Sequence, residues 1–302
     1  MLNPSGSAKL SVITLVYRRD KQLGNLADSL YQSYLELAPE ARPEVQFVIV
    51  DMECDHATPI YIEDSKFKID QYNIHEYFDT TTATLPLAAA RNLGGQKASA
   101  PYYAFVDVDC LVEPYFFAKF LQFSRSQEST KICMGYPEYL PYIPLDGCYS
   151  NYADSAVVHP GRAALKDRKL IEWKSFWSLC FFISAENFEL IRGFDEGFTG
   201  YGAEDTDFAK RANASGIEFT MQGPRVLHQY HTKIDPPLNY LDDIVANSNY
   251  YHKKWQQYPM MKWLDSMRNS GYINKDFEEE GIRVIKHPKA ADLASHLSLN
   301  PY

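Results

Sequence analysis

The sequence of 302 residues contains no apolar run long enough to cross a bilayer. Its most apolar segments, SVITLV, FVIV and SLCFFI, have the length of strands. The first residues, MLNPSGSAKL, also lack the charged and then apolar pattern of a signal peptide. We therefore expect a cytoplasmic protein without a transmembrane segment, and peripheral association with a membrane stays open.

Three further absences exclude other classes of protein. The five cysteines are irregularly spaced and form no CxxC pair, which excludes a zinc knuckle and a disulfide framework. No Lys/Arg run interrupts a net charge of −9, so we expect no nucleic-acid partner. No GxGxxG follows the first apolar run, where VYRRD stands, which argues against a dinucleotide-binding dehydrogenase. An acidic protein can still bind an anionic substrate when a metal ion bridges the two.

Over the first 110 residues, apolar strand-like segments alternate with segments of helical periodicity. We expect strands at 11–17, 45–50 and 102–106, another near 67–78, and helices at 20–37 and 86–99. This alternation predicts an α/β fold with a mostly parallel central sheet flanked by helices. Ligands of such sheets lie at the carboxyl ends of the strands, where Asp51 and Asp107 fall.

The second half of the chain is more irregular. We expect helices at 113–126, 185–192 and 204–215, a strand at 176–184, a strand pair near 217–227, and an elaborated loop over 135–173. From about residue 236 the pattern is helical again and then irregular. We divide the chain into a catalytic domain, 1–235, and a C-terminal helical extension, 236–302. The catalytic domain has a nucleotide-binding half, 10–112, and an acceptor-binding half, 113–235.

The strongest local motif is Asp107-Val108-Asp109, two carboxylates directly after a buried strand. An oxygen-rich site of this kind suits Mg²⁺ or Mn²⁺, which bridge phosphate oxygens. An Asp-x-Asp also occurs as a turn that caps the next helix, so the motif needs support from other segments.

That support comes from the segment AAARNLGGQKASAPYYAFVDVD, which resembles the donor-binding stretch of GT-A-type glycosyltransferases, particularly inverting family 2. ITLVYRRD and VIVD are similar to the uracil-binding edge of that family. The resemblance implies a GT-A fold, a UDP-sugar donor and a Mn²⁺ or Mg²⁺ cofactor. It implies that Asp109 binds the metal and that Asp107 reaches the ribose or the metal.

The same resemblance implies that Asp51 contacts the base and that Arg91 lies near the nucleotide. Tyr17 and Arg18 are further candidates for contact with the uridine. Each residue also has an ordinary alternative, a loop cap for Asp51 and a surface ion pair for Arg91.

A second block, FWSLCFFISAENFELIRGFDEGFTGYGAEDTDFAKRANASG, resembles the acceptor side of β-1,4-galactosyltransferases and chondroitin-polymerase-like enzymes. The resemblance implies that Asp205 deprotonates the acceptor hydroxyl and that Glu204 holds the acceptor. Both carboxylates fall in the first turn of a helix, whose positive end we expect to keep them ionised. Asp207 has the spacing of an ion pair with Arg211, so its role can be structural.

Two histidines follow this block in PRVLHQYH. In related enzymes a downstream His completes the metal shell, which implies His228 as a metal ligand, with His231 as the alternative. Trp177 faces the donor sugar or the acceptor by analogy, and ordinary core packing is the alternative.

Together these resemblances imply an inverting, metal-dependent hexosyltransferase. It would move Gal, GalNAc or Glc from a UDP-sugar to a saccharide, glycoconjugate or other hydroxyl acceptor. A retaining GT-A transferase and a non-catalytic nucleotide-sugar-binding module are the alternatives. The sequence leaves open the donor sugar, the acceptor and a homodimer.

Overall fold

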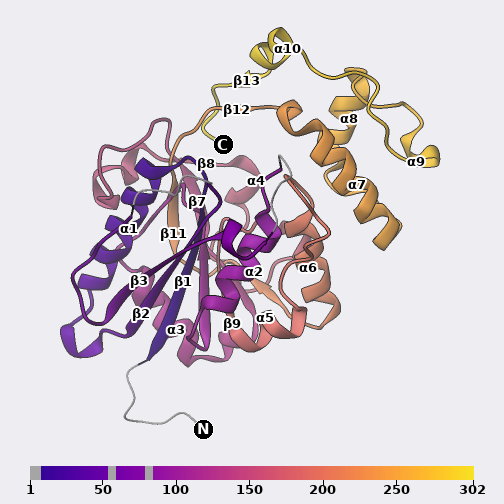
Figure 1. Ribbon diagram of the computed structural model, residues 1–302. Helices are drawn as coiled ribbons and strands as arrows, with labels where there is room; N and C mark the ends of the chain where they lie inside the picture. The colour runs from indigo at the N-terminus through magenta and orange to yellow at the C-terminus, as the bar shows by residue number, and fades with distance from the viewer. Residues whose placement is uncertain (1–7, 54–58, 79–83) are drawn as a thin grey trace.

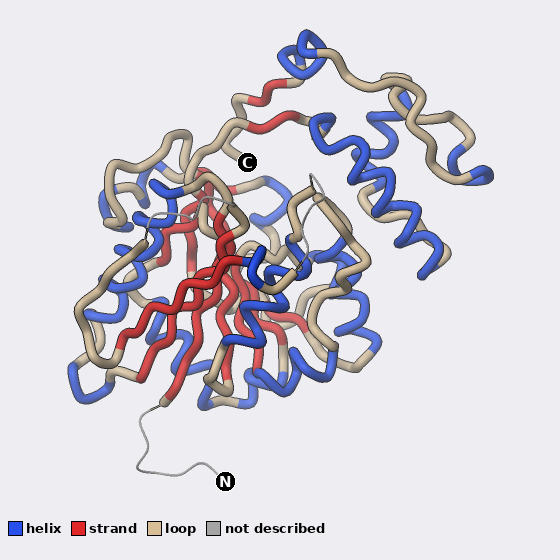
Figure 2. The backbone as a smooth tube through the Cα atoms, in the orientation of Figure 1, coloured by secondary structure: helices blue, strands red, loops and turns tan. Residues whose placement is uncertain are grey.

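A computed structural model describes residues 8–53, 59–78 and 84–302. In these residues the large sheet has the strand order β10-β6-β9-β4-β1-β2-β3 (Figures 1 and 2). Its strands are β1 Lys9–Val16, β2 Glu44–Asp51, β3 Phe67–Asn73, β4 Tyr102–Val106, β6 Ile132–Met134, β9 Cys180–Ser184 and β10 Phe219–Thr220. Neighbours pair in parallel except at β9, which is antiparallel to β4 and β6. The mostly parallel α/β fold expected from the sequence is confirmed.

Two smaller sheets complete the described strands. The four-stranded one has the order β5-β11-β7-β8 and consists of β5 Cys110–Val112, β11 Arg225–His228, β7 Tyr136–Tyr139 and β8 Val157–Val158. The other pairs β12 Lys233–Ile234 with β13 Leu297–Ser298. The sequence predicted 217–227 as a strand pair, but β10 and β11 lie in different sheets. It also predicted 135–173 as an elaborated and partly helical loop; the segment contains a short helix, but also β7 and β8, which were not predicted.

Helices cover both faces of the large sheet. The α-helices are α1 Asp20–Leu35, α2 Leu87–Lys97, α3 Phe116–Arg125, α4 Pro160–Ala163, α5 Ala185–Ile191, α6 Glu204–Ala214, α7 Leu241–Trp255, α8 Met261–Asn269, α9 Phe277–Glu280 and α10 Ala290–Ser295. Short 3₁₀ turns span Pro39–Ala41, Ile74–Glu76, Gln127–Thr130, Tyr149–Asn151, Ala153–Ser155, Trp173–Ser175 and Leu238–Tyr240. None of the helices in the described parts of the chain is long and apolar enough to cross a membrane.

The two faces of the sheet each have a hydrophobic core because side chains alternate along a strand. In β2, Phe47 and Ile49 join the core formed with α1 and α3, whereas Val48 and Val50 join the core formed with α2, α5 and α6. Because β1 pairs in parallel with β2 and β4, the carboxyl ends of these three strands lie at one edge of the sheet, where Val16 pairs with Asp51. Asp107 follows β4 at the same edge.

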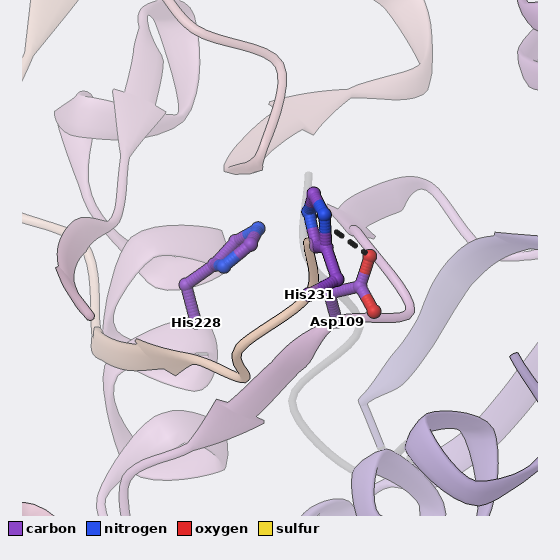
Figure 3. Close-up of side chains that lie close together, drawn as sticks. All are labelled: Asp109, His228 and His231. Atoms are coloured by element: carbon purple, nitrogen blue, oxygen red, sulfur yellow. Dashed lines mark ion pairs between the residues drawn. The ribbon is translucent and has the colours of Figure 1, made fainter. Parts of the chain in front are cut away.

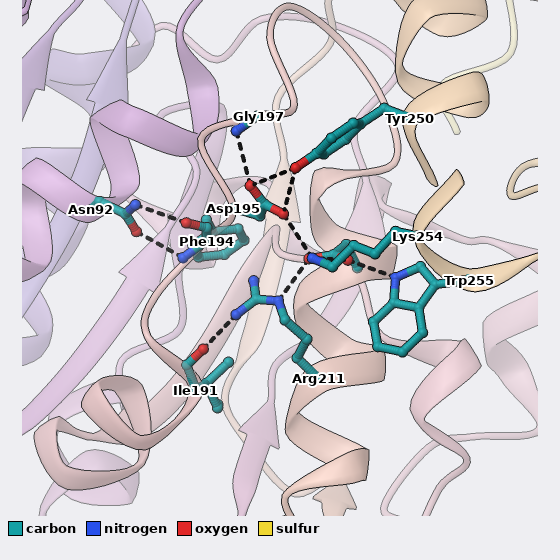
Figure 4. Close-up of polar contacts among 10 residues, drawn as sticks. Asn92, Ile191, Phe194, Asp195, Gly197, Arg211, Tyr250, Lys254 and Trp255 are labelled. Carbon is teal, nitrogen blue, oxygen red and sulfur yellow. Dashed lines mark hydrogen bonds and ion pairs between the residues drawn. The ribbon is translucent and has the colours of Figure 1, made fainter. Parts of the chain in front are cut away.

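The helix α7 ties the C-terminal extension to the segment that leads into α6 (Figure 4). Asp207 is fully buried and accepts hydrogen bonds from Arg211 Nε at 2.7 Å and Trp255 Nε1 at 2.8 Å. Lys254 Nζ lies 2.8 Å from Asp207 and 2.7 Å from Asp195. The expected pairing of Asp207 with Arg211 is confirmed, and α7 supplies two further partners that hold α6 in place.

Close packing of α2 on the sheet generates the first testable prediction. A Cβ at Gly94 would lie 2.4 Å from Cγ2 of Ile13, a buried, β-branched side chain with little room to move. We expect Gly94→Ala to lower the free energy of unfolding by about 1–3 kcal/mol through overpacking. Urea denaturation measures the change.

Gly24 is the matched control, because it lies inside α1 and a Cβ there meets nothing within 4 Å. Gly24→Ala should be neutral or should raise the free energy of unfolding by about 0.5–1 kcal/mol, since alanine loses less backbone entropy in a helix. Equal stability changes in the two variants would contradict the close approach of α2 to β1.

Candidate active site

Asp109, His228 and His231 form a cluster that can hold a metal ion. Each offers one ligand atom, and these atoms lie within 4.8 Å of one another. Figure 3 shows the three side chains pointing toward one another, with His231 Nε2 3.9 Å from Asp109 Oδ2. The second sheet builds the cluster, because β11 pairs His228 with Cys110 and the Gln229 amide donates to the Asp109 carbonyl at 2.6 Å.

The donor atoms of this cluster fit a divalent cation. His228 Nδ1 is buried and has no hydrogen-bond partner in the part of the chain that the structure describes. Burial lowers the pKa of His228 to about 3, aided by the charge of His231, so the imidazole is neutral and keeps a lone pair for a metal. Asp109 Oδ1 lies 3.3 Å from Arg19 Nε without a well-directed hydrogen bond. One carboxylate and two imidazoles are a ligand set that suits Mn²⁺ better than Ca²⁺.

Asp107 lies beside this cluster and faces Arg91. Arg91 is 6% exposed on α2, and its guanidinium contacts three groups. Nη1 donates to Glu204 Oε1 at 3.1 Å, Nη2 donates to Ser178 Oγ at 3.0 Å, and Asp107 Oδ1 lies 4.0 Å from Nη2. Arg91 therefore joins the predicted nucleotide-binding half to the predicted acceptor-binding half.

The pKa of Asp107 depends on its burial and on the charged groups around it. Burial raises its pKa to about 7, the positive charge of Arg91 opposes the rise, and the negative charges of Asp109 and Glu204 add to it. A cation bound at the cluster would favour the charged carboxylate. Asp107 is therefore placed to respond to the charge of a bound ligand.

Glu204 and Asp205 begin α6, after a turn that only flexible backbone can make. Gly200 and Gly202 have φ of +72° and +101°, and a Cβ at Gly200 would lie 2.2 Å from the Asp243 carboxylate. Asp243 in turn accepts from the amide of Tyr201 at 3.1 Å. The turn and α7 together fix where α6 starts.

The pKa of Asp205 is raised, although the residue lies at the positive end of a helix. Burial, followed by the charge of Glu204, raises the pKa of Asp205 to about 6, and Arg91 only partly offsets the rise. The helix field is weaker than these two effects because it acts only on the first turn and is easily outweighed by burial. Glu204 Oε2 is buried without a hydrogen-bond partner in the described chain, so it can accept from a bound hydroxyl.

The predicted uridine contacts lie at the ends of β1 and β2. Asp51 is fully buried, and its Oδ1 accepts from the amide of Glu53 at 2.8 Å. Arg18 has a φ of +52°, lies 5.0 Å from the ring of Tyr17, and donates its amide to Glu53. The structure thus places Tyr17, Arg18 and Asp51 at the carboxyl ends of these two strands.

Trp177 lies just before β9 and is half-buried. The guanidinium of Arg162 lies over its ring at 3.2 Å from the centroid. Three residues at the site were missed by sequence reasoning, namely Arg19, Ser178 and Arg162. The first stands in the segment VYRRD that resembles the uracil-binding edge, but the other two carry no local pattern.

Comparisons with known proteins fit this geometry. A family model described as "Glycosyltransferase like family 2" matches residues 35–240. A validoxylamine A glucosyltransferase of Streptomyces hygroscopicus subsp. limoneus is 29% identical over 232 residues, which cover 70% of this chain and 49% of the relative. Its counterpart from S. hygroscopicus subsp. jinggangensis is 32% identical over 155 residues, 45% of this chain and 37% of the relative. The chain thus spans half or less of these relatives.

Two solved structures share the fold. The mannosyltransferase PcManGT of Pyrobaculum calidifontis, in complex with GDP-Man and Mn²⁺, has a TM-score of 0.51 and 12% identity over 85% of this chain and 67% of its own. GalNAc-T7 with UDP, GalNAc and Mn²⁺ has a TM-score of 0.50 and 16% identity over 89% of this chain and 55% of its own. The expected GT-A fold is therefore confirmed. Because the family model covers more than half of the length of this chain, the chain belongs to the glycosyltransferase like family 2.

Proposed function

We propose that this chain is an inverting, metal-dependent hexosyltransferase that uses a UDP-sugar and transfers the sugar to a hydroxyl of a saccharide or glycoconjugate. The observation that carries the proposal is the convergence of two groups of side chains at one sheet edge. Asp109, His228 and His231 can hold a cation, and Arg91 links Asp107 to the Glu204 end of α6. Glycosyl transfer from a nucleotide sugar needs a metal ion that stabilises the leaving diphosphate and a carboxylate that deprotonates the acceptor. These two groups of side chains are arranged to supply both.

The nucleotide and the sugar of the donor are proposed from the site residues and from the similar proteins together. The two structural neighbours were solved with Mn²⁺ and with UDP or GDP-Man, so both nucleotides occur on this fold. Tyr17 and Asp51 at the edge of β1 and β2 are the proposed contacts of uridine. Among Gal, GalNAc and Glc, the name of the curated relatives adds weight to Glc.

In the proposed mechanism, Asp109, His228 and His231 hold the cation, and Arg91 and Asp107 adjoin the nucleotide. A bound Mn²⁺ or Mg²⁺ would supply Lewis-acid stabilisation of the departing diphosphate. Glu204 accepts a hydrogen bond from the acceptor through its unpartnered Oε2. Asp205 removes the proton of the attacking hydroxyl, on the face of the sugar opposite to the leaving group. An α-linked donor then yields a β-linked product, and NMR of the anomeric linkage distinguishes this outcome from retention.

Asp205 is the direct test of the base. Asp205→Asn keeps the size of the side chain but cannot accept the proton, so we expect transfer to fall by about 10²–10⁴-fold. Binding of UDP with Mn²⁺, measured by calorimetry, should stay within about twofold, because Asp205 does not hold the donor. Asp242→Asn is the matched control, since Asp242 is exposed on α7 and pairs with His287. Full activity of Asp205→Asn would show that another group is the base.

The metal site generates a second prediction. His228→Ala and His231→Ala should each weaken Mn²⁺ binding by about tenfold or more, because each removes a ligand atom of the cluster. Electron paramagnetic resonance of free Mn²⁺ measures the affinity directly. His287→Ala removes an exposed imidazole outside the cluster and should leave the affinity unchanged. If either cluster variant binds Mn²⁺ as the wild type does, that histidine is not a ligand.

The pH dependence of transfer follows from the raised pKa of Asp205. The base acts only when deprotonated, so kcat should rise with pH through about 6 and then level off. The charge of Glu204 raises this pKa, so Glu204→Gln should move the acidic limb to lower pH in whatever activity remains. Steady-state rates across the acidic range measure the limb. A limb that stays in place or moves to higher pH would contradict the coupling of the two carboxylates.

A further inference from the structure

Arg162 is a buried cation without an acidic partner. It lies on α4, is 3% exposed, and forms no ion pair with any carboxylate in the described parts of the chain. Its Nη1 donates to the carbonyl of Ser175, and its guanidinium lies over the ring of Trp177. Burying an unpaired charge costs free energy, so such a group is usually matched by a counter-ion. In a chain with a net charge of −9, a buried arginine that lacks one is unusual.

Two lysines extend this positive region. Lys233 pairs with Ser298 in the small sheet, and the ring of Tyr302, four residues further on, lies 5.1 Å from the ring of His159. Burial, and then the charges of Arg162, Lys233 and Lys262, lower the pKa of His159. Neither Lys233 nor Lys262 forms an ion pair with the described residues. Lys233 is half-buried in β12, whose backbone is fixed by pairing with Ser298. Lys262 is exposed on α8. The C-terminal extension therefore supplies Lys262 and, in β13, the partner strand of Lys233.

A chain of ring contacts connects the region to the metal cluster. The ring of Tyr139 lies 5.2 Å from that of His228 and 6.4 Å from that of His159. The ring of His159 lies 5.3 Å from that of Trp177. Trp177 immediately precedes Ser178, which accepts the hydrogen bond from Arg91. Arg162 therefore borders the active site on the side of Trp177.

We propose that Arg162, Lys233 and Lys262 bind an anionic group of the acceptor, so that the acceptor is a phosphorylated or carboxylated sugar. This inference rests on the proposed function, because it assigns a substrate class to the same active site. The position beside Trp177 favours the acceptor over the donor as the ligand of these cations. Arg162 lies over Trp177, and the next residue, Ser178, shares Arg91 with Glu204, which adjoins the proposed base Asp205 in sequence. Trp177 offers a ring next to the cation, and a sugar can stack on such a ring while the guanidinium binds its oxyanion.

The test uses the full chain and three probes, namely glucose 6-phosphate, glucuronate and glucose. Each is titrated by calorimetry with and without UDP and Mn²⁺. We expect the two anionic sugars to bind wild-type protein at least about tenfold more tightly than glucose, because a guanidinium forms strong charge-assisted hydrogen bonds with an oxyanion. Whichever of glucose 6-phosphate and glucuronate binds more tightly shows whether the site prefers phosphate or carboxylate. Equal binding of the three sugars by wild-type protein would overturn the proposal.

The variants identify the groups responsible. Arg162→Gln and Lys233→Gln should each weaken binding of the anionic sugar by about tenfold or more. Lys275→Gln, the same change at an exposed lysine of the extension, should not. Because Lys233 is less buried, its variant keeps the test decisive if Arg162→Gln does not fold. Anion binding that is unchanged in both variants would overturn the proposal.

Titration of the variants with UDP and Mn²⁺ separates this inference from the proposed function. The affinity for UDP with Mn²⁺ should stay within about twofold in both variants. A parallel loss of UDP affinity would mean that the cations serve the donor diphosphate, which overturns the acceptor assignment and leaves the transferase proposal intact. Absence of UDP binding and of UDP-sugar hydrolysis in wild-type protein would overturn the proposed function, while the titrations without UDP would still decide the anion site.

Discussion

The buried guanidinium of Arg91 is the interaction on which the candidate active site depends. It lies among Asp107 after β4, Ser178 before β9 and Glu204 at the start of α6, three segments that are far apart in the sequence. Arg91 and Glu204 are both nearly inaccessible to water, and removing one partner of such a pair typically costs about 3–5 kcal/mol. Burial raises the pKa of both Asp107 and Asp205, and the charge of Arg91 opposes that rise.

The position of α6 is determined by the extension as much as by the catalytic part. Asn247 of α7 donates to the carbonyls of Thr199 and Gly202 at 2.9 Å each, and Lys254 and Trp255 hold Asp207 one turn inside α6. These contacts fix both ends of the turn that precedes Glu204. The extension therefore acts on the geometry of the carboxylate pair and, through β13, which pairs with β12, and α8, on the cations beside Trp177. Its role is structural toward α6, and we propose a binding role toward the acceptor.

The sequence predicted well what depends on local pattern. The long buried strands, the helices between them and the order of Asp107, Glu204 and His228 along the chain all follow from periodicity and motif. It predicted poorly what depends on tertiary placement. The strands of the second sheet are two to four residues long. Such lengths carry no periodicity, and yet this sheet brings His228 to Asp109.

The site residues also divide into those that local sequence pattern predicts and those that depend on tertiary placement. His231 was the alternative to His228, whereas the structure brings both to Asp109. Ser178 and Arg162 are defined by burial and by what they contact, which no spacing reveals. The raised pKa of Asp205 was missed because burial and the charge of Glu204 outweigh the helix field. Each miss thus reflects a long-range contact or a desolvation effect that a single sequence does not contain.

The central claim, that the sheet edge holds a metal-dependent nucleotide-sugar site, is tested most directly by anomalous X-ray diffraction at the manganese edge. Crystals of the full chain grown with UDP and MnCl₂ should show one strong anomalous peak bonded to Asp109, His228 and His231, with the diphosphate on its open side. A peak held by other residues, or no peak in crystals that contain bound UDP, would contradict the account.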